Sequence, residues 1–427
     1  MKKFLALLLC AVMVFSFAAC SGNTTGGGEG TDTKGNDTAN DGEKSDLKIG
    51  IILVGDENEG YTYAHIEGIK SAMSTLGIAE SQVIWKYSIP EDEKCAETAD
   101  DLIDQGCTAI FSNSYNHQTY MQQKASENPD VTFVAATGDT AAISGLSNFK
   151  NCFTGVYESR YVSGVVAGMK LAELVKDGKI EDANKDADGN IKIGYVGAYP
   201  YAEVVSGYTA FYLGIKSIVE NVVMDVQYTN SWFDITAEGE AANALMARGC
   251  VIIGQHADST GAPAAVQAQL GAGKTVYSVG YNVDMLSVAP DAALTSATNV
   301  WGVYYTYAFG QLQKGEEIAT DWAKGYADGA VAITELGKSC AEGTQEKVDA
   351  VIAAIKDGTL HVFDINTFTV GGEKVESCKV DMNGDFDNVD EEDKEAIWDG
   401  YFHESELRSA PSFSLRIDGI TELNSEG

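Results

Sequence analysis

Positively charged residues are scarce in this sequence. Its 427 residues include 29 Lys and Arg against 63 Asp and Glu, which gives a formal net charge of −34. Proteins that bind DNA, RNA or anionic lipid surfaces use clustered Lys and Arg, which neutralise phosphates and release their counterions. The composition therefore argues against phosphate-backbone binding, and we predict no nucleic-acid partner.

Proline is also rare, with 6 residues against 45 glycines. This balance is typical of tight turns between regular elements and not of extended linkers. Because 44% of the residues are apolar and 22% are charged, the chain is neither a disordered nor a collagen-like polymer. At roughly 150 residues per domain we expect two or three domains, and two lobes are the working interpretation.

The sequence lacks the signatures of common enzymes and zinc sites. It has no G-x-S-x-G elbow, no H-E-x-x-H helix, no G-x-G-x-x-G after a strand and no C-x-x-C pair. We therefore predict that the protein is not an enzyme and carries no cofactor or metal. The stretch Asp381–Glu392 partly matches a calcium loop but has Phe386 where the loop needs Gly. A solvated acidic turn is the favoured interpretation of this stretch, and calcium binding stays open.

The N-terminus has the pattern of an export signal. Two lysines precede an apolar run over Phe4–Ala19, which is followed by Cys20. The run of ~16 residues is short for a membrane-spanning helix. Phe17-Ala18-Ala19-Cys20 resembles a lipobox, so we expect a lipoprotein signal peptide over residues 1–19 and a diacylated Cys20, with plain secretion as the alternative.

A polar, glycine-rich stretch follows this signal. Ala39 is the one apolar residue among residues 21–46, so the stretch cannot bury enough surface to fold. We therefore expect residues 20–46 to form a disordered tether. Signal and tether together predict a protein held by its lipid at the extracytoplasmic face of the cell membrane.

The cysteines of the remaining chain show no metal-binding spacing. Cys107, Cys152 and Cys250 lie in or beside apolar runs and are predicted to be small buried hydrophobic residues. Export permits disulfides. Cys340 and Cys378 lie in a polar region, and a disulfide between them stays an open alternative.

From Leu47 onward, apolar runs alternate with amphipathic segments of about 12 to 17 residues, which is typical of βα units around parallel sheets. The pattern predicts an α/β protein with two doubly wound parallel-sheet lobes joined by a hinge. We expect the chain to cross between the lobes near Thr154–Glu158 and near Tyr281–Asp284. The first lobe would comprise residues 47–156 plus about 284–320, and the second residues 157–283 plus about 321–427.

The predicted segments fall into two groups. Strands are expected at Lys48–Val54, Val83–Tyr87, Thr108–Ser112, Val131–Ala135, Ile193–Val196, Val222–Tyr228, Val251–Gln255, Val276–Tyr281, Ala293–Ala297 and Leu360–Phe363. Helices are expected at Tyr63–Leu76, Asp92–Gln105, Thr119–Glu127, Arg160–Lys176, Val204–Val219, Thr236–Ala247, Trp301–Lys314 and Val348–Lys356.

Aromatic and acidic residues recur where predicted strands end. Tyr61 follows the first strand, and Asn230–Asp234, Gln255–Ser259 and Gly280–Asp284 follow three later ones. Open α/β sheets bind ligands at the carboxyl ends of their strands, so these side chains would face a cleft. Asp234 and Asp258 have an alternative interpretation as helix N-caps.

At these residues the sequence resembles the basic membrane protein family of purine nucleoside-binding lipoproteins, the substrate-binding components of ABC importers. Four segments carry the resemblance, and together they are quite specific. They are similar to the family's R-Y-x-x-G-x-x-A-G, G-(Y/F)-V…P-x-x-E-V, N-S-W-F-D and Q-H-x-D-S motifs, and stand here at Glu158–Gly168, Ile193–Val204, Asn230–Asp234 and Gln255–Ser259.

The resemblance implies a type I periplasmic-binding-protein fold whose lobes close on a purine nucleoside or related purine. The base would lie between the rings of Tyr61 and Trp232, and stacking is worth roughly 1–3 kcal/mol per base. The polar residues implied for the site are Asp258 and Asp284 as hydrogen-bond acceptors, Ser114 and Tyr115 as weaker candidates, and Asn282, where relatives frequently carry Asp.

The implied partners are an ABC permease and its ATPase, together with the small-molecule ligand and the membrane. Carboxylates in a closing cleft would repel phosphate, so nucleosides should be preferred over nucleotides. Two alternatives stay open: a ligand-sensing lipoprotein that signals through a partner, and a nucleoside-cleaving hydrolase of similar architecture.

Overall fold

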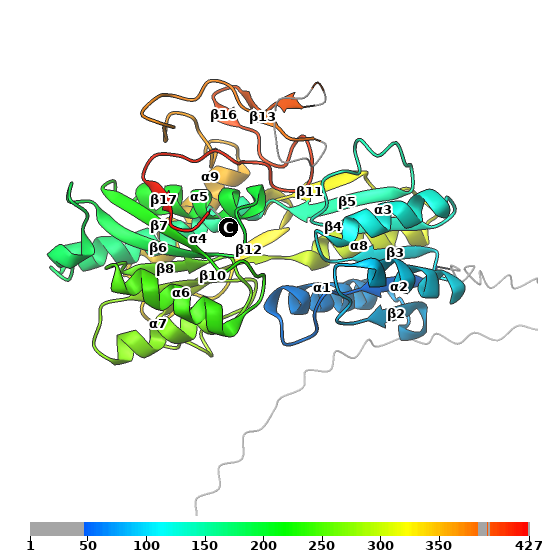
Figure 1. Ribbon diagram of the computed structural model, residues 1–427, viewed down its shortest axis with the longest axis horizontal. Coiled ribbons are helices and arrows are strands. Elements are labelled where there is room, and N and C mark those ends of the chain that lie inside the picture. Colours follow the sequence, from blue (N-terminus) through cyan, green and yellow to red (C-terminus); the bar gives the residue numbers. More distant parts are fainter. Residues whose placement is uncertain (1–46, 383–390, 392, 426–427) are drawn as a thin grey trace, which may run out of the picture. The chain divides into compact units, whose positions relative to one another are not determined.

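The computed structural model describes residues 47–382, 391 and 393–425. Within them the chain forms two α/β units, each built on one large sheet (Figure 1). The predicted signal peptide, the lipidated Cys20 and the tether lie outside the described residues. So does most of the acidic stretch Asp381–Glu392, and these predictions stay untested.

The first lobe is a fully parallel sheet of six strands with its helices. Its strand order is β11-β5-β4-β3-β1-β2. The strands are β1 (Ile49–Ile52), β2 (Val83–Lys86), β3 (Ala109–Ser112), β4 (Thr132–Ala136), β5 (Phe149–Thr154) and β11 (Asp321–Lys324). Its helices are α1 (Gly60–Leu76), α2 (Glu93–Asp104), α3 (His117–Glu127) and α8 (Trp301–Gln313), with the 3-10 turn η1 (Glu80–Gln82) before β2.

The second lobe is a sheet of seven strands in the order β12-β10-β9-β8-β6-β7-β17, parallel except for β12. The strands are β6 (Ile191–Gly197), β7 (Val222–Tyr228), β8 (Ile252–Gln255), β9 (Tyr277–Tyr281), β10 (Ala293–Asn299), β12 (Val331–Ile333) and β17 (Ile420–Glu422). The helices are α4 (Val156–Lys176), α5 (Ala202–Lys216), α6 (Ile235–Ala247), α7 (Gly261–Gly271) and α9 (Thr344–Lys356), with the 3-10 turns η2 (Asp182–Asn184) and η3 (Tyr326–Asp328).

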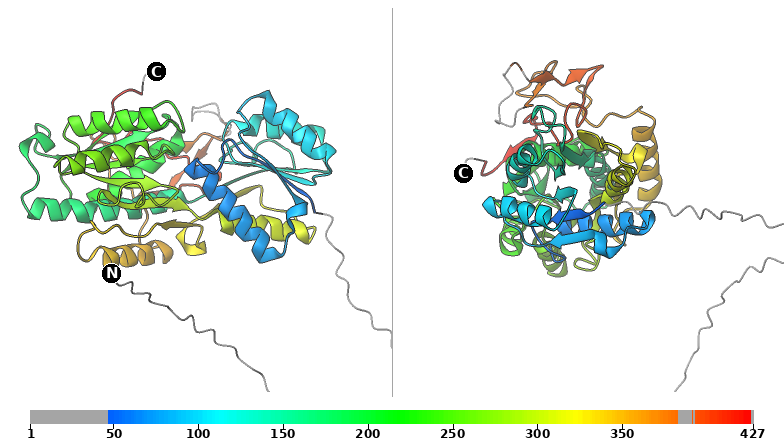
Figure 2. Two further views of the ribbon diagram at one scale, coloured as in Figure 1. Left: turned by 90° about the horizontal axis from the view of Figure 1, so that it is seen from below. Right: turned by 90° about the vertical axis from the view of Figure 1, so that its right-hand side faces the viewer.

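Helices cover both faces of each sheet (Figure 2), which explains the near-continuous apolar runs of the strands. All four residues of β1 are buried. Ile51 and Ile52 are neighbours on this strand but belong to different hydrophobic clusters, because successive side chains point to opposite faces of a sheet. Both layers of helices therefore help to fix the strand ends that carry the site.

Three chain crossings join the lobes. The first lies between β5 and α4, within the predicted Thr154–Glu158. The structure differs from the prediction near Tyr281–Asp284, because β10 pairs in parallel with β9 and stays in the second sheet. The chain crosses only after Asn299, where α8 packs on α1, and crosses again after β11, which pairs with β5.

These crossing segments are held together by hydrogen bonds. Gly155 N donates to Lys324 O at 2.7 Å, and Val300 N donates to Ala330 O at 2.8 Å. Between the first two crossings, Thr154 Oγ1 donates to Asn299 Oδ1 at 2.5 Å. The crossings therefore lie side by side as the predicted hinge requires.

The chain after α9, residues 357–425 as far as the structure describes them, is called here the C-terminal segment. It holds two short hairpins and then adds β17 to the edge of the second sheet beside β7 (Figure 1). The hairpin strands are β13 (Lys379–Val380) with β14 (Lys394–Glu395), and β15 (Ile397–Trp398) with β16 (Tyr401–Phe402).

The cysteines of the described chain all carry free thiols. Cys107, Cys152 and Cys250 are buried, as predicted. Cys340 and Cys378 do not form the disulfide that the sequence left as an alternative, and Cys340 Sγ instead donates to Leu294 O at 3.2 Å. Among residues 47–382, 391 and 393–425, no helix combines the length and apolar character needed to cross a membrane.

Candidate ligand-binding site at the strand ends

The two sheets repeat one topology. The order β2-β1-β3-β4-β5 of the first lobe recurs as β7-β6-β8-β9-β10 in the second. In such sheets the loops after the two central strands leave in opposite directions and open a crevice, which is where open α/β sheets bind ligands. The crevice therefore lies beyond β1 and β3 in one lobe and beyond β6 and β8 in the other.

One cavity is lined by residues from these strand ends. It encloses about 450 Å³ of space, open solvent at its mouth included. Each lobe contributes about half of the wall. The lining residues are Val54, Glu59, Tyr61, Asn113, Ser114, Tyr115 and Thr137 from the first lobe, and Glu203, Trp232, His256, Asp258 and Tyr281 from the second.

The two predicted aromatic residues come from opposite lobes and line this same cavity. Tyr61 lies in the first turn of α1 and packs edge-on against His65, with 4.6 Å between ring centroids. Trp232 follows β7 and packs edge-on against Tyr199 at 5.3 Å. Because other rings support each of them, both present preformed apolar surfaces to a ligand.

Asp258 is held by a chain of amide side chains. Asn282 Nδ2 donates to Asp258 Oδ1 at 2.8 Å, and Asn299 Nδ2 donates to Asn282 Oδ1 at 2.9 Å. Asn299 in turn accepts from Thr154 at the first crossing. All four side chains are buried. Asp258 is thus oriented by a hydrogen-bonded chain that ends at the crossings between the lobes.

Burial changes the acid–base character of the cavity. It raises the pKa of Glu203 to about 7, although the Arg160 guanidinium opposes this change. Burial also raises the pKa of Asp258, to which Glu59 and Glu203 add repulsion, and it raises the pKa of Glu59. Carboxyl groups that hold their protons near neutral pH both donate and accept hydrogen bonds.

His256 is neutral for a related reason. Burial and the nearby Arg160 charge hold its pKa well below the ordinary value. Its Nε2 lies 3.2 Å from Glu203 Oε1. Arg160 itself is buried, donates from Nη1 to Gln255 O at 2.6 Å and lies 3.6 Å above the centre of the Tyr281 ring. A ligand therefore meets a wall of aromatic rings and largely neutral polar groups.

The structure brings most of the predicted site residues together. Tyr61, Ser114, Tyr115, Trp232 and Asp258 all line the cavity. Their contact with a ligand stays a prediction.

Two predicted residues do not line the cavity. Asn282 lies behind Asp258 and orients it. Asp284 is exposed, and its Oδ1 accepts from Leu286 N, so it stabilises a turn. Asp234 is the N-cap of α6, accepting from Thr236 N and Ala237 N at 2.9 Å, as its alternative interpretation predicts.

Several lining residues were not predicted. Glu203 and His256 stand inside the motifs that carried the resemblance, and Tyr281 ends a predicted strand, so the sequence contained a signal for each. Glu59, Asn113 and Thr137 stand outside those motifs, although each follows a predicted strand. Thr137 follows β4 with a left-handed φ of 66°, a conformation that a polar turn residue does not announce in sequence.

Two sheets of this topology that share a cavity define a ligand-binding protein of the solute-receptor class. The family model described as "ABC transporter substrate-binding protein PnrA-like" matches residues 47–365. The chain belongs to this family, known as Bmp, whose members are substrate-binding proteins and not enzymes. The resemblance to the basic membrane protein family is thereby confirmed.

Individual relatives agree with this assignment. The chain is 30% identical over 318 residues to a purine-binding protein of Brucella abortus, covering 74% of this chain and 83% of that protein. It is 29% identical over 374 residues to a putative ABC transporter glucose-binding protein of Haloferax volcanii, covering 87% and 86%.

Solved structures show the fold. A solute-binding protein of an ABC transporter system from Aeropyrum pernix superposes with a TM-score of 0.61 at 14% identity, covering 74% of this chain and 93% of that chain. The predicted type I periplasmic-binding-protein fold is confirmed.

Proposed function

We propose that the protein captures a purine nucleoside or related purine in the cavity between Tyr61 and Trp232. The observation that carries this proposal is the placement of one supported aromatic ring from each lobe at a single cavity. A purine has two flat faces for such rings and a rim of nitrogen donors and acceptors. The side chains of Glu203, His256 and Asp258, which burial holds toward their neutral forms, suit that rim. The purine-binding relative from Brucella abortus supports the same ligand class.

Capture would proceed by closure of the lobes on the ligand. A ligand drives closure only if it binds the closed state better, which requires contacts to both lobes. Tyr61 and Trp232 meet that requirement, and the Asp258–Asn282–Asn299 chain links the site to the crossings. The closed receptor would then dock on an ABC permease whose ATPase drives import.

We further propose that a diacylated Cys20 anchors the receptor at the extracytoplasmic face of the membrane, with residues 20–46 as its tether. The lipobox-like Phe17–Cys20 supports this proposal. Mass spectrometry of the membrane-extracted protein should find a lipid-modified N-terminal Cys20. A receptor that signals to a partner would use the same cavity, and a purine uptake assay with and without the receptor distinguishes it from an importer component.

The ligand proposal is tested by replacing one ring. In calorimetric titrations with adenosine, guanosine and inosine, Trp232→Ala should weaken binding at least tenfold, because one stacking face is lost. The matched control is Trp398→Ala in β15, a residue that is 37% exposed. It should leave the affinity unchanged.

Titration with glucose belongs in the same panel, because a relative carries that name. Tight glucose binding together with no binding of any purine or nucleoside would overturn the proposal. Equal affinity of wild type and Trp232→Ala for the nucleosides would remove Trp232 from the site. Native mass spectrometry of the untreated protein gives an independent check, since a retained ligand would reveal its mass.

A further inference from the structure

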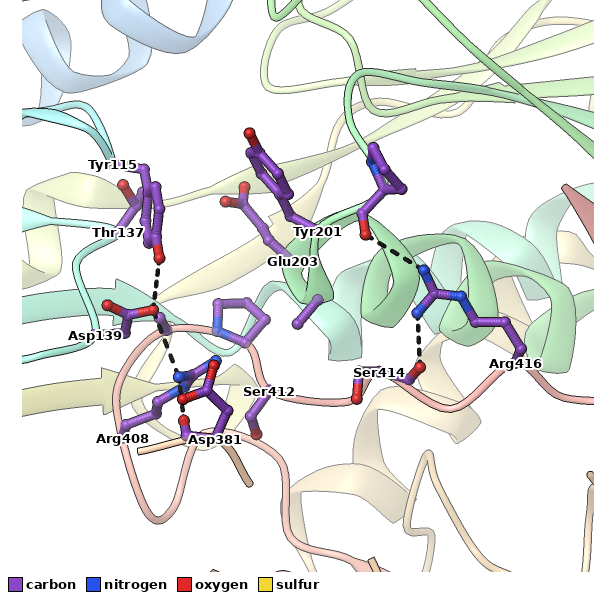
Figure 3. A pocket seen from close by; sticks show the side chains of 14 residues that line it. Tyr115, Thr137, Asp139, Tyr201, Glu203, Asp381, Arg408, Ser412, Ser414 and Arg416 are labelled. Carbon is purple, nitrogen blue, oxygen red and sulfur yellow. Dashed lines mark hydrogen bonds and ion pairs between the residues drawn. The ribbon is translucent and has the colours of Figure 1, made fainter. Parts of the chain in front are cut away.

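The C-terminal segment contains a loop over residues 404–413, which we call the clasp. It lies beyond residue 365, where the match to the family model ends. Together with its neighbours in the C-terminal segment, the clasp forms one wall of a second chamber, and both lobes supply the other walls (Figure 3). This chamber shares Tyr115, Thr137 and Glu203 with the first cavity, so the clasp lies on the side of the molecule where the lobes face each other.

A single carboxylate holds the two ends of the clasp together. Glu404 Oε2 accepts from Ser412 N at 2.9 Å, from Ser412 Oγ at 2.8 Å and from Phe413 N at 2.9 Å. Its Oε1 accepts from Ser206 Oγ in α5 at 2.5 Å. All of these residues are buried. The base of the clasp is therefore attached to the second lobe, which also holds the last strand of the C-terminal segment, β17.

The tip of the clasp contacts the first lobe at two carboxylates. Arg408 lies 3.5 Å from Asp139 Oδ2, and both side chains are buried (Figure 3). Ser409 donates to Asp321 Oδ1 from its main-chain N at 2.9 Å and from its Oγ at 2.7 Å. Asp139 follows β4 and Asp321 begins β11, two strands of the first sheet. The clasp thus connects the second lobe to the first through contacts other than the three chain crossings.

The two charged partners are each positioned by their own part of the molecule. Asp139 Oδ2 accepts from Tyr115 Oη at 2.9 Å, and its Oδ1 accepts from Gln118 Nε2 at 2.9 Å. Arg408 Nη1 donates to the main-chain oxygen of Asp381 in the C-terminal segment (Figure 3). Because both groups are already oriented, little side-chain freedom is lost when they meet.

These contacts favour the arrangement in which the lobes are together. The hydrogen bonds from Tyr115 and Gln118 already replace part of the hydration of Asp139, so the approach of Arg408 compensates its charge at a small further desolvation cost. Separation of the lobes would break this pair and the two hydrogen bonds that Ser409 donates. An interaction made only in the closed state shifts the population toward that state.

We propose that the clasp is a built-in latch, which stabilises the closed state of the receptor through the contacts of Arg408 and Ser409 with the first lobe. The proposal rests on the lobe closure of the proposed function, but it is independent of which ligand the cavity takes. A ligand would then supply less of the free energy of closure, and would leave more slowly, than if the two lobes acted alone.

The first test needs no ligand. A donor and an acceptor fluorophore, attached to unnatural amino acids at Lys94 in α2 and Thr236 in α6, report the distance between the lobes in single molecules. Both residues are exposed and lie at the start of helices that follow strands. In Arg408→Gln the ratio of short-distance to long-distance molecules should fall by about threefold or more, and Asp139→Asn should lower it in the same direction.

The matched control is another arginine of the same segment. Arg416 pairs with Glu422 at 3.2 Å and donates to Ser414 O, so its described contacts involve no residue of the first lobe. Arg416→Gln should therefore keep the wild-type distance distribution. The double variant Arg408→Gln with Asp139→Asn should differ from either single variant by less than about twofold, because all three remove the same pair.

The second test measures release by stopped-flow kinetics. Arg408→Gln should raise the dissociation rates of adenosine and inosine by the same factor, about threefold or more, because the latch acts on closure and not on one ligand. A loss confined to one of the two nucleosides would make Arg408 a ligand contact and overturn the proposal.

A milder variant protects the test against a failure of Arg408→Gln to fold, which circular dichroism detects. Ser409→Ala removes one hydrogen bond and no charge, and it should shift the distance distribution in the same direction. Distributions that are identical in the wild type and in every folded clasp variant would overturn the proposal. If no purine or nucleoside binds, the proposed ligand is wrong, and the ligand-free distances still decide whether the clasp is a latch.

Discussion

At the scale of single residues, burial gives this site its chemistry. Glu203, His256 and Asp258 would each be charged or half-charged in water near neutral pH, yet the cavity holds all three toward their neutral forms. A wall of neutral donors and acceptors is complementary to an uncharged heterocycle. The same burial makes the folding equilibrium depend on pH.

The first prediction concerns Glu203. Its pKa is about 7 in the folded protein and near 4.5 when unfolded, so the folded state binds more protons between these values. Stability should therefore be higher at the acidic end of this window and decrease as pH rises. Relative to Glu203→Gln, the free energy of unfolding of the wild type should fall by on the order of 2 kcal/mol between pH 4.5 and pH 7.

Denaturant titrations at several pH values measure this difference. Asp258 remains in both proteins, so its own pH dependence largely cancels. Glu342→Gln is the control, because Glu342 is exposed, and its difference from the wild type should be flat with pH. A flat Glu203→Gln difference would show that this carboxyl is solvated.

At the scale of elements, the contact of α4 with α5 depends on the absence of side chains. A methyl group on Gly164 would lie 2.2 Å from Phe211 O, and one on Gly214 would lie 2.1 Å from Tyr161 O. The clashing atoms belong to the backbone, so no rotamer change relieves them. Because α4 carries Arg160, and α5 carries Glu203 in its first turn, this close approach also sets the distance between two groups of the site.

The second prediction follows from that contact. Gly164→Ala should lower the free energy of unfolding by about 2–4 kcal/mol, since the helices must separate. Gly271→Ala at the end of α7 is the matched control, because its methyl group would meet no non-neighbouring atom within 4 Å. It should be neutral or stabilising by up to about 1 kcal/mol. Thermal unfolding measures the change in Tm of both variants. Equal changes in Tm for Gly164→Ala and Gly271→Ala would contradict the helix-packing argument.

At the scale of the whole molecule, the net charge bears on which ligands the proposed purine site accepts. The net charge of −34 repels anions at long range. Nucleosides are neutral, whereas nucleotides carry phosphate.

The third prediction is that adenosine monophosphate binds at least tenfold more weakly than adenosine. Raising the salt concentration should narrow the gap, because screening weakens the long-range part of the repulsion. Calorimetry at low and high salt measures both effects. A monophosphate that binds as tightly as the nucleoside would contradict the charge argument.

Much of the fold could be predicted because buried parallel strands appear in the sequence as short, nearly continuous runs of apolar residues. Val222–Tyr228 was predicted to the residue, and nine of the ten predicted strands correspond to observed ones, whereas Leu360–Phe363 does not form a strand. β5 escaped prediction because Lys150 and Asn151 interrupt its apolar pattern. Asn151 is nonetheless fully buried, since its side chain donates to Ala135 O and accepts from Ala141 N. Tertiary hydrogen bonds allow polar residues in a buried strand, and sequence periodicity does not record them.

The positions of several candidate site residues could also be predicted from the sequence. Tyr61, Trp232 and Asp258 follow strands, and strand ends of doubly wound sheets converge by topology, so their position in sequence indicated their position in space. Asp284 also follows a strand but is exposed, because the side-chain direction of a loop residue depends on its turn.

The sequence by itself determined the acidic composition, the alternation of strands and helices, and the family, because each is a property of neighbouring residues or of short motifs. Tertiary structure alone decided that β10 stays in the second sheet, that burial raises the pKa of Glu203 to about 7 and lowers the pKa of His256, and that Arg408 meets Asp139 from 269 positions away in the chain. Strand pairing, desolvation and long-range contacts all depend on which residues, far apart in the sequence, pack against one another. Local sequence patterns do not specify that packing.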